Sequence, residues 1–243
     1  MATAILIDGE FFLRRYRFLF GKQVSKQVAT DLHWMCREHL KQSDGKKTLY
    51  RIFFYDCPPL GKKVHNPITG KPVDFSVSPT AVWRLALHDE LRRLRKVALR
   101  LGYLNERIGH WTVRPDKLKL LLSGKIASKD LSETDVLYSV TQKGVDMRIG
   151  LDIASLTFKK LVDQIILVSG DSDFVPAAKL ARREGIDFIL DPVWASIRPD
   201  LHEHIDGLRT VFSRPASTTS GQLGQPSVSG PDSYHKSDGS DLS

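Results

Sequence analysis

The chain has 243 residues, 41% of them hydrophobic and 26% charged, which is typical of a globular protein long enough to bury a sizeable core. Lys and Arg outnumber Asp and Glu by 36 to 28, and this basic surplus favours a polyanionic partner, nucleic acid ahead of anionic lipid. Two cysteines exclude a disulfide scaffold and a cysteine-based zinc site, and no apolar stretch is long enough for a leader or a membrane span, so we expect a cytoplasmic protein with no membrane partner.

Short apolar runs alternate with amphipathic patterns along residues 1–212. In chain order they predict a strand over 4–7, a helix over 24–40, a strand over 49–55, a helix over 80–101, an extra strand or hairpin over 105–114, a strand over 136–141, a helix over 144–160, a strand over 165–168, a helix over 174–184 ended by Gly185, and a strand over 186–190. This alternation predicts a single α/β doubly wound domain with a central, mostly parallel sheet flanked by helices.

The composition changes at residue 213. The last 31 residues contain nine Ser, four Gly and three Pro, with few apolar side chains among them. Such a segment cannot bury enough apolar surface to offset its ordering entropy, so we expect residues 213–243 to form a disordered tail.

Aspartates follow several of the predicted strands. Asp8 follows the first, Asp146 lies where the strand over 136–141 gives way to a helix, and Asp171 and Asp173 come just after the strand over 165–168. Ligands bind outside the carboxyl ends of parallel strands, and two carboxylates one residue apart repel each other unless a cation lies between them. Oxygen-only ligands favour Mg²⁺ or Mn²⁺ over zinc.

Other acidic residues have simpler interpretations. Asp56 and Asp191 also end strands, but a proline follows each closely, and we expect both to cap helices. Asp152 lies six residues after Asp146, about 120° around an ideal helix, and is a candidate for supporting the site from behind.

Three blocks resemble the signatures of the NYN domain, a branch of the PIN-like nucleases. They are ILIDG at residues 5–9, KGVD at residues 143–146 and SGDSDF at residues 169–174. The resemblance implies a Rossmann-like PIN fold over residues 1–212 and Mg²⁺- or Mn²⁺-dependent hydrolysis of RNA. It maps the catalytic and metal-binding carboxylates onto Asp8, Asp146, Asp171 and Asp173, with Asp152, Lys143, Ser169 and Ser172 as supporting candidates. In one departure, Glu10 stands near where many relatives carry Asn or a similar polar residue.

Basic residues are concentrated in one part of the chain. Residues 81–129 contain twelve Lys or Arg against four acidic residues, and Arg92, Arg95 and Lys96 would share one face of the helix predicted there. A second group, Arg14, Arg15 and Arg17, follows Asp8 closely. We expect both groups to contact the phosphates of RNA.

Two functions remain in competition: a metal-dependent ribonuclease, and an RNA-binding or regulatory module that keeps the fold without the chemistry. A phosphatase acting on small esters would need a second aspartate where Glu10 stands. Neither G-x-G-x-x-G nor a P-loop occurs, which disfavours a nucleotide cofactor. The sequence leaves the RNA substrate, the mode of cleavage and a homo-oligomeric state open.

Overall fold

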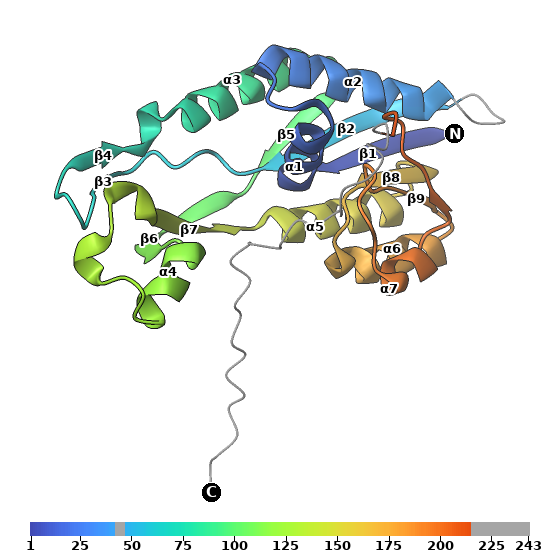
Figure 1. Cartoon of the computed structure of the whole chain (residues 1–243). Coiled ribbons are helices and arrows are strands. Elements are labelled where there is room, and N and C mark those ends of the chain that lie inside the picture. Colours follow the sequence, from blue (N-terminus) through green and yellow to red (C-terminus); the bar gives the residue numbers. More distant parts are fainter. Residues whose placement is uncertain (42–46, 215–243) are drawn as a thin grey trace, which may run out of the picture. The chain divides into compact units, whose positions relative to one another are not determined.

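The central sheet is built from the apolar runs that predict strands. The computed structural model describes residues 1–41 and 47–214. In this part of the chain, six strands lie in the order β10-β9-β8-β1-β2-β5, and all neighbouring strands are parallel (Figure 1). Their bounds are β1 (Ala2–Asp8), β2 (Thr48–Asp56), β5 (Val97–Leu101), β8 (Gln164–Val168), β9 (Asp187–Asp191) and β10 (Gly207–Leu208). The expected parallel α/β architecture is confirmed.

Helices cover both faces of this sheet, as Figure 1 shows. One face packs against α1 (Gly9–Phe20), α2 (Ser25–Lys41) and α3 (Pro79–Arg93), and the other against α5 (Val145–Phe158), α6 (Val175–Arg183) and α7 (Pro199–Glu203). The alternation of side chains along a strand explains the two cores: Ile5 and Ile7 enter the first, whereas Ala4 and Leu6 enter the second. The predicted helices over 24–40, 144–160 and 174–184 are confirmed as α2, α5 and α6.

The prediction of one helix over residues 80–101 is wrong. The helix α3 ends at Arg93, the backbone reverses at Lys96 in a left-handed conformation (φ 64°), and residues 97–101 form β5. This strand pairs with β2 at the edge of the central sheet, where its apolar residues are half-buried. The helix α1 had no counterpart among the predicted elements; it begins directly after Asp8, which caps it.

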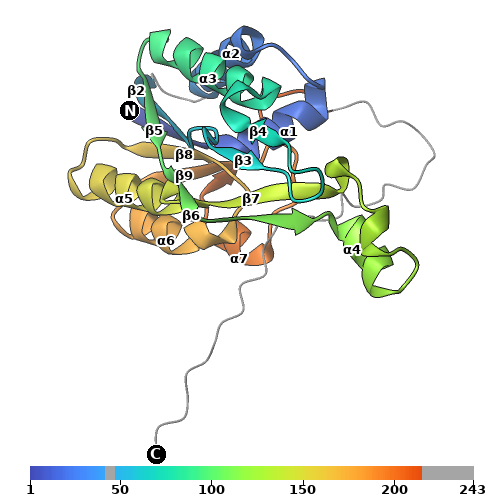
Figure 2. The same cartoon turned by 90° about the vertical axis from the view of Figure 1, so that its left-hand side faces the viewer.

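A second, antiparallel ribbon lies outside the central sheet (Figure 2). It pairs β6 (Tyr103–Val113) with β7 (Val136–Lys143), which confirms the extra strand over 105–114 but places the strand over 136–141 away from the main sheet. Shorter elements are β3 (Lys63–His65), β4 (Pro72–Asp74), α4 (Pro115–Leu122) and single turns of 3-10 helix at 75–77, 128–130, 133–135 and 172–174. Trp111 and Tyr138 pack with Phe75 (ring centroids 5.4–6.4 Å apart) to hold the ribbon together.

The expected disordered tail lies almost entirely outside the described residues, which end at Arg214. Within residues 1–41 and 47–214, no helix combines the length and apolar character needed to cross a bilayer.

Candidate acidic site

Asp8 stands at the carboxyl end of the central strand β1 and has two partners. Its Oδ1 accepts a hydrogen bond from the Phe11 backbone N–H at 3.1 Å and so caps α1, while Ser169 Oγ donates to its Oδ2 at 3.4 Å. Ser169 is fully buried at the end of the neighbouring strand β8, since Ile7 pairs with Val168 in the register of the two strands. The first and third signature blocks therefore meet at this carboxylate.

Two glycines allow this close packing. A side chain at Gly9 would collide with the carbonyl oxygen of Tyr55 and with the ring of Phe54, and one at Gly170 would lie 2.8 Å from the ring of Phe11. Both positions are therefore restricted to glycine by space rather than by backbone conformation.

The ionised form of Asp8 is disfavoured. Burial, together with the negative charges of Asp146 and Glu10, raises the pKa of Asp8 to about 6, although the hydrogen bonds from Phe11 and Ser169 act in the opposite direction. With a pKa of about 6, the Asp8 carboxyl group is mostly ionised at neutral pH, and keeping this charge buried lowers the stability of the fold.

Asp146 lies in the first turn of α5, two residues after the left-handed Gly144 (φ 82°). Its pKa is also raised, first by partial burial and then by the charges of Asp171, Asp173 and Glu10. The second signature block thus brings its aspartate into the same electrostatic neighbourhood as the other two blocks, although the preceding strand β7 lies outside the central sheet.

Asp171 and Asp173 form the exposed part of the site. Asp171 Oδ1 accepts a hydrogen bond from the Asp173 backbone N–H at 2.9 Å and caps the short helical turn at 172–174, while the Asp171 N–H donates to Ser169 Oγ at 3.3 Å. Ser172 lies in that turn, between the two aspartates. Capping of this turn gives the Asp171 carboxylate a structural role, but it gives none to the Asp173 carboxylate.

Glu10 is a fifth carboxylate in this place. Its charge raises the pKa of both Asp8 and Asp146, and its Oε2 accepts a hydrogen bond from Gln142 Nε2 at 2.6 Å. The departure from the family pattern therefore adds negative charge to the site. We call Asp8, Glu10, Asp146, Asp171 and Asp173 the acidic cluster.

The side-chain chemistry of the acidic cluster suits a divalent cation, but its described carboxylates do not surround a space for one. All five donors are carboxylates, the ligands that Mg²⁺ and Mn²⁺ accept, and burial, followed by the charges of neighbouring carboxylates, raises the pKa values of Asp8 and Asp146. Within the described residues, however, no three His, Cys, Asp or Glu side chains are close enough together to enclose a metal ion.

A cleft of about 440 Å³ opens beside the acidic cluster, between α5 and α6. Asp146 and Asp173 contribute to it, and the remaining lining is apolar: Met147, Gly150, Phe174, Pro176, Ala177 and Leu180.

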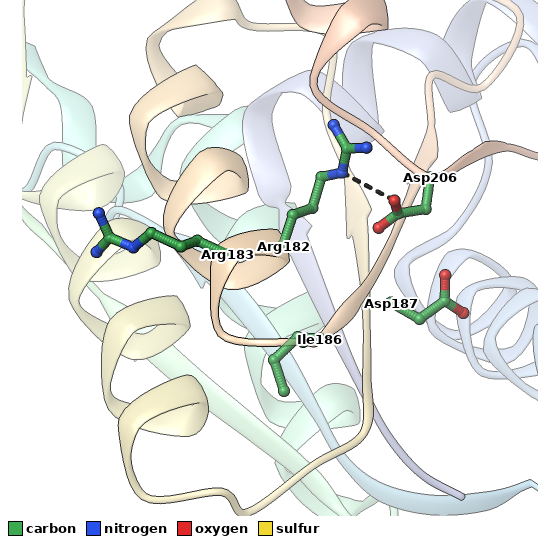
Figure 3. Close-up of a pocket in the computed structure, with 6 residues that line it drawn as sticks. Arg182, Arg183, Ile186, Asp187 and Asp206 are labelled. Carbon is green, nitrogen blue, oxygen red and sulfur yellow. Dashed lines mark hydrogen bonds and ion pairs between the residues drawn. The ribbon is translucent and has the colours of Figure 1, made fainter.

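A larger cavity of about 640 Å³ lies where α6 ends and β9 begins, and Arg182 there pairs with Asp206 at 2.8 Å (Figure 3). Strands begin at that edge, so this second cavity is separate from the acidic cluster.

Asp152 and Lys143, two of the supporting candidates, have contacts with the central sheet and with the antiparallel ribbon. Asp152 accepts a hydrogen bond from Tyr55 Oη at 2.8 Å and pairs with Arg100 (Nε to Oδ2, 3.1 Å), so its carboxylate is engaged with the sheet. Lys143 ends β7, where it pairs in register with Tyr103.

Asp56 and Asp191 are structural, but not as helix caps. Asp56 is 1% exposed and pairs with Arg84 (2.8 Å) and His88 (2.7 Å), both on α3. Asp191 pairs with the buried His39 of α2 at 2.8 Å. The expectation of helix capping was wrong because both carboxylates are buried beneath helices that come from distant parts of the chain.

The two groups of basic residues lie at opposite edges of the sheet. Arg15 Nε donates to the carbonyl oxygen of Val193 at 2.9 Å, which places α1 beside the loop after β9, at the carboxyl edge. Arg92, in contrast, pairs with Asp89 at 2.6 Å, and Lys96 Nζ donates to the carbonyl of Leu49 at the start of β2. The expected shared helical face of Arg92, Arg95 and Lys96 does not exist, because Arg95 and Lys96 form the turn that leads into β5.

The chain was compared with known protein families and with solved structures. A sequence model described as the NYN domain matches residues 83–201, a range that includes the second and third signature blocks. Among solved structures, the chain is similar to a protein of unknown function from Vibrio parahaemolyticus RIMD 2210633, with 17% identity, coverage of 87% of this chain and 93% of that chain, and a TM-score of 0.45. No curated protein matches the chain.

Proposed function

Because the chain belongs to the NYN domain family, we propose that it is a metal-dependent nuclease that hydrolyses phosphodiester bonds in RNA. The observation that carries the proposal is the convergence of Asp8, Asp146, Asp171 and Asp173, from three separate blocks of sequence, on one electrostatically coupled site. Negative charge gathered in this way is costly for a fold and is a mark of functional sites.

These four aspartates would hold Mg²⁺ or Mn²⁺. When bound, such an ion lowers the pKa of water and stabilises charge on a phosphoryl oxygen. Ser169 fixes the orientation of Asp8 through its hydroxyl group, and the N–H of Asp173 does the same for Asp171. Asp146 either ligates the ion or orients the attacking water.

Basic side chains beside the site would attract and position the polyanion. Arg14 and Arg17 are exposed on α1, the helix that Asp8 caps, and we assign them to phosphate contacts. Arg92, Arg95 and Lys96 lie at the opposite edge of the sheet and have no part in this proposal. The compartment it implies is the cytoplasm, where thiols such as the buried, unpaired Cys36 and Cys57 stay reduced.

The alternative, an RNA-binding module without catalysis, is favoured by one observation. Within the described residues, no three of the carboxylates lie close enough together to form a set of metal ligands. The two functions differ in what a cation does: a nuclease turns over only with the ion, whereas a binding module holds RNA with or without it.

The test is incubation of the full chain with end-labelled RNA and DNA in Mg²⁺, Mn²⁺ or EDTA. We expect cleavage of RNA that requires the ion, and loss of cleavage in Asp171→Asn and in Asp173→Asn. Asp89→Asn is the matched control, because it removes a carboxylate that is also exposed but lies on α3. Binding of RNA without cleavage under any of these conditions would favour the alternative.

A further inference from the structure

Exposed aromatic rings and an arginine lie together on the outer side of α1. Phe18 is 62% exposed and Trp194 is 42% exposed, so burial in a core explains neither ring. Arg15 links them: its guanidinium lies over the ring of Phe18, 4.7 Å from the centroid, and donates to the carbonyl oxygen of Val193, next to Trp194. We call Phe18, Arg15 and Trp194 the aromatic strip.

The turn that presents Trp194 is strained and firmly held. Val193 and Trp194 have φ angles of 44° and 60°, a conformation that costs of the order of 1–3 kcal/mol for each non-glycine residue. Asp191 Oδ1 accepts a hydrogen bond from the Val193 N–H at 2.8 Å, and the Trp194 indole N–H donates to the carbonyl of Phe212 at 2.7 Å. The polar edge of the indole is therefore satisfied within the protein, while part of the ring stays in solvent.

The aromatic strip lies near the acidic cluster. Asp191 pairs in register with Val168, and Val168 pairs with Ile7, so the turn after β9 leaves the sheet at the level where Asp8 begins α1. Along α1, Arg15 is about 10 Å from Asp8 at roughly 1.5 Å per residue. Arg14 and Arg17 are exposed on the same helix, where Glu10 is the single acidic residue.

We propose that the aromatic strip is a base-stacking subsite of this protein, which binds unpaired bases of the nucleic acid beside the acidic cluster. This inference rests on the proposed nuclease function, for which it names residues that hold the substrate. Bases stack on aromatic faces and on guanidinium planes irrespective of sequence, and a flanking arginine contacts the phosphates. In a duplex the faces of the bases are already stacked on one another and could not reach the rings.

The test is fluorescence anisotropy of a labelled single-stranded RNA and of a matched RNA duplex, with the full chain in EDTA so that binding is measured without cleavage. We expect the single strand to bind more tightly. Phe18→Leu should weaken its binding by about 5- to 100-fold, the range expected for loss of one stacked base. Phe18→Tyr keeps an aromatic face and should bind like the unmodified chain.

Phe158→Leu is the matched control, because Phe158 is also exposed but lies at the end of α5, and we expect it to leave binding unchanged. Trp194→Leu should repeat the effect of Phe18→Leu, and its melting temperature shows whether the turn still folds. If Trp194→Leu does not fold, Phe18→Leu alone decides the test, because the Phe18 ring is mostly exposed to solvent and its replacement should leave the fold intact.

Equal binding of the duplex and the single strand, or unchanged RNA binding by Phe18→Leu, would overturn the inference. It would also be overturned if Phe18→Leu left RNA binding intact but abolished binding to anionic vesicles or sedimentation of the chain as a dimer. Failure of the nuclease proposal is distinguishable from failure of this one. Binding that depends on Phe18, without cleavage in any cation, would refute catalysis and support the strip. Cleavage by a chain whose binding ignores Phe18 would refute the strip alone.

Discussion

Replacement of Asp8 by Asn should stabilise the metal-free protein at neutral pH. The neutral amide has the same shape, so its oxygen can still accept from the Phe11 N–H, and Asn caps helices as well as Asp does. What the substitution removes is a negative charge that burial, Asp146 and Glu10 all disfavour. The fold would therefore lose the repulsion and keep the cap.

The pKa of Asp8 sets the size and the pH range of this effect. A pKa of about 6 in place of 3.8 corresponds to about 3 kcal/mol, at roughly 1.4 kcal/mol per pH unit. Because the folded state holds this proton more tightly than the unfolded chain does, wild-type stability declines as the pH rises from about 4 to about 6, and the deficit is complete above that. The advantage of Asp8→Asn should be up to about 3 kcal/mol at pH 8 and should vanish near pH 4.

Urea unfolding of both proteins in EDTA, followed by circular dichroism at several pH values, measures this difference. A gap in free energy of unfolding that opens between pH 4 and pH 7 supports the reasoning. If Asp8→Asn is less stable than wild type at pH 8, or if the gap is the same at every pH, the electrostatic account of Asp8 is wrong.

Three further predictions concern the structure around the site. Gly9→Ala should lower the melting temperature markedly, because its methyl group would collide with the backbone of β2; a wild-type melting temperature would show that the chain gives way there. Arg84→Met should destabilise the fold by about 3–5 kcal/mol in urea unfolding, since it leaves Asp56 buried with only the His88 side chain as a partner in that network, and a loss below 1 kcal/mol would count against that network. Replacing Arg92, Arg95 and Lys96, at the amino edge of the sheet, together by Gln should leave the salt dependence of RNA binding as in wild type. A weaker dependence of affinity on salt concentration would show that these residues contact RNA.

Local patterns were sufficient to predict the central strands and most of the helices. Continuous runs such as residues 4–7 and 165–168 are buried on both faces, so their composition alone identifies them as parallel strands. The rule that ligands lie beyond the carboxyl ends of strands was enough to bring Asp8, Asp171 and Asp173 to one edge of the sheet.

The errors came where tertiary contacts decide the structure. Residues 97–101 continue the helical spacing of leucines from α3, and only pairing with β2 makes them a strand. The partners of Asp56 are residues 84 and 88, which share a helical face, but no local signal connects that face with the end of β2. Glu10 is coupled to Asp146 and accepts a hydrogen bond from Gln142, and both contacts join residues far apart in the chain.

The central claim is that the acidic cluster binds a divalent cation, and calorimetric titration of the full chain with Mn²⁺ near pH 6 tests it most directly. Because burial raises the pKa of Asp8 to about 6, binding should release protons from a partly protonated cluster, seen as a heat that varies with the ionisation enthalpy of the buffer. We expect Asp146→Asn to weaken binding strongly and Asp89→Asn to leave it unchanged. Absence of Mn²⁺ binding by the wild-type chain, or equal binding by wild type and Asp146→Asn, would contradict the assignment of this cluster as a metal centre.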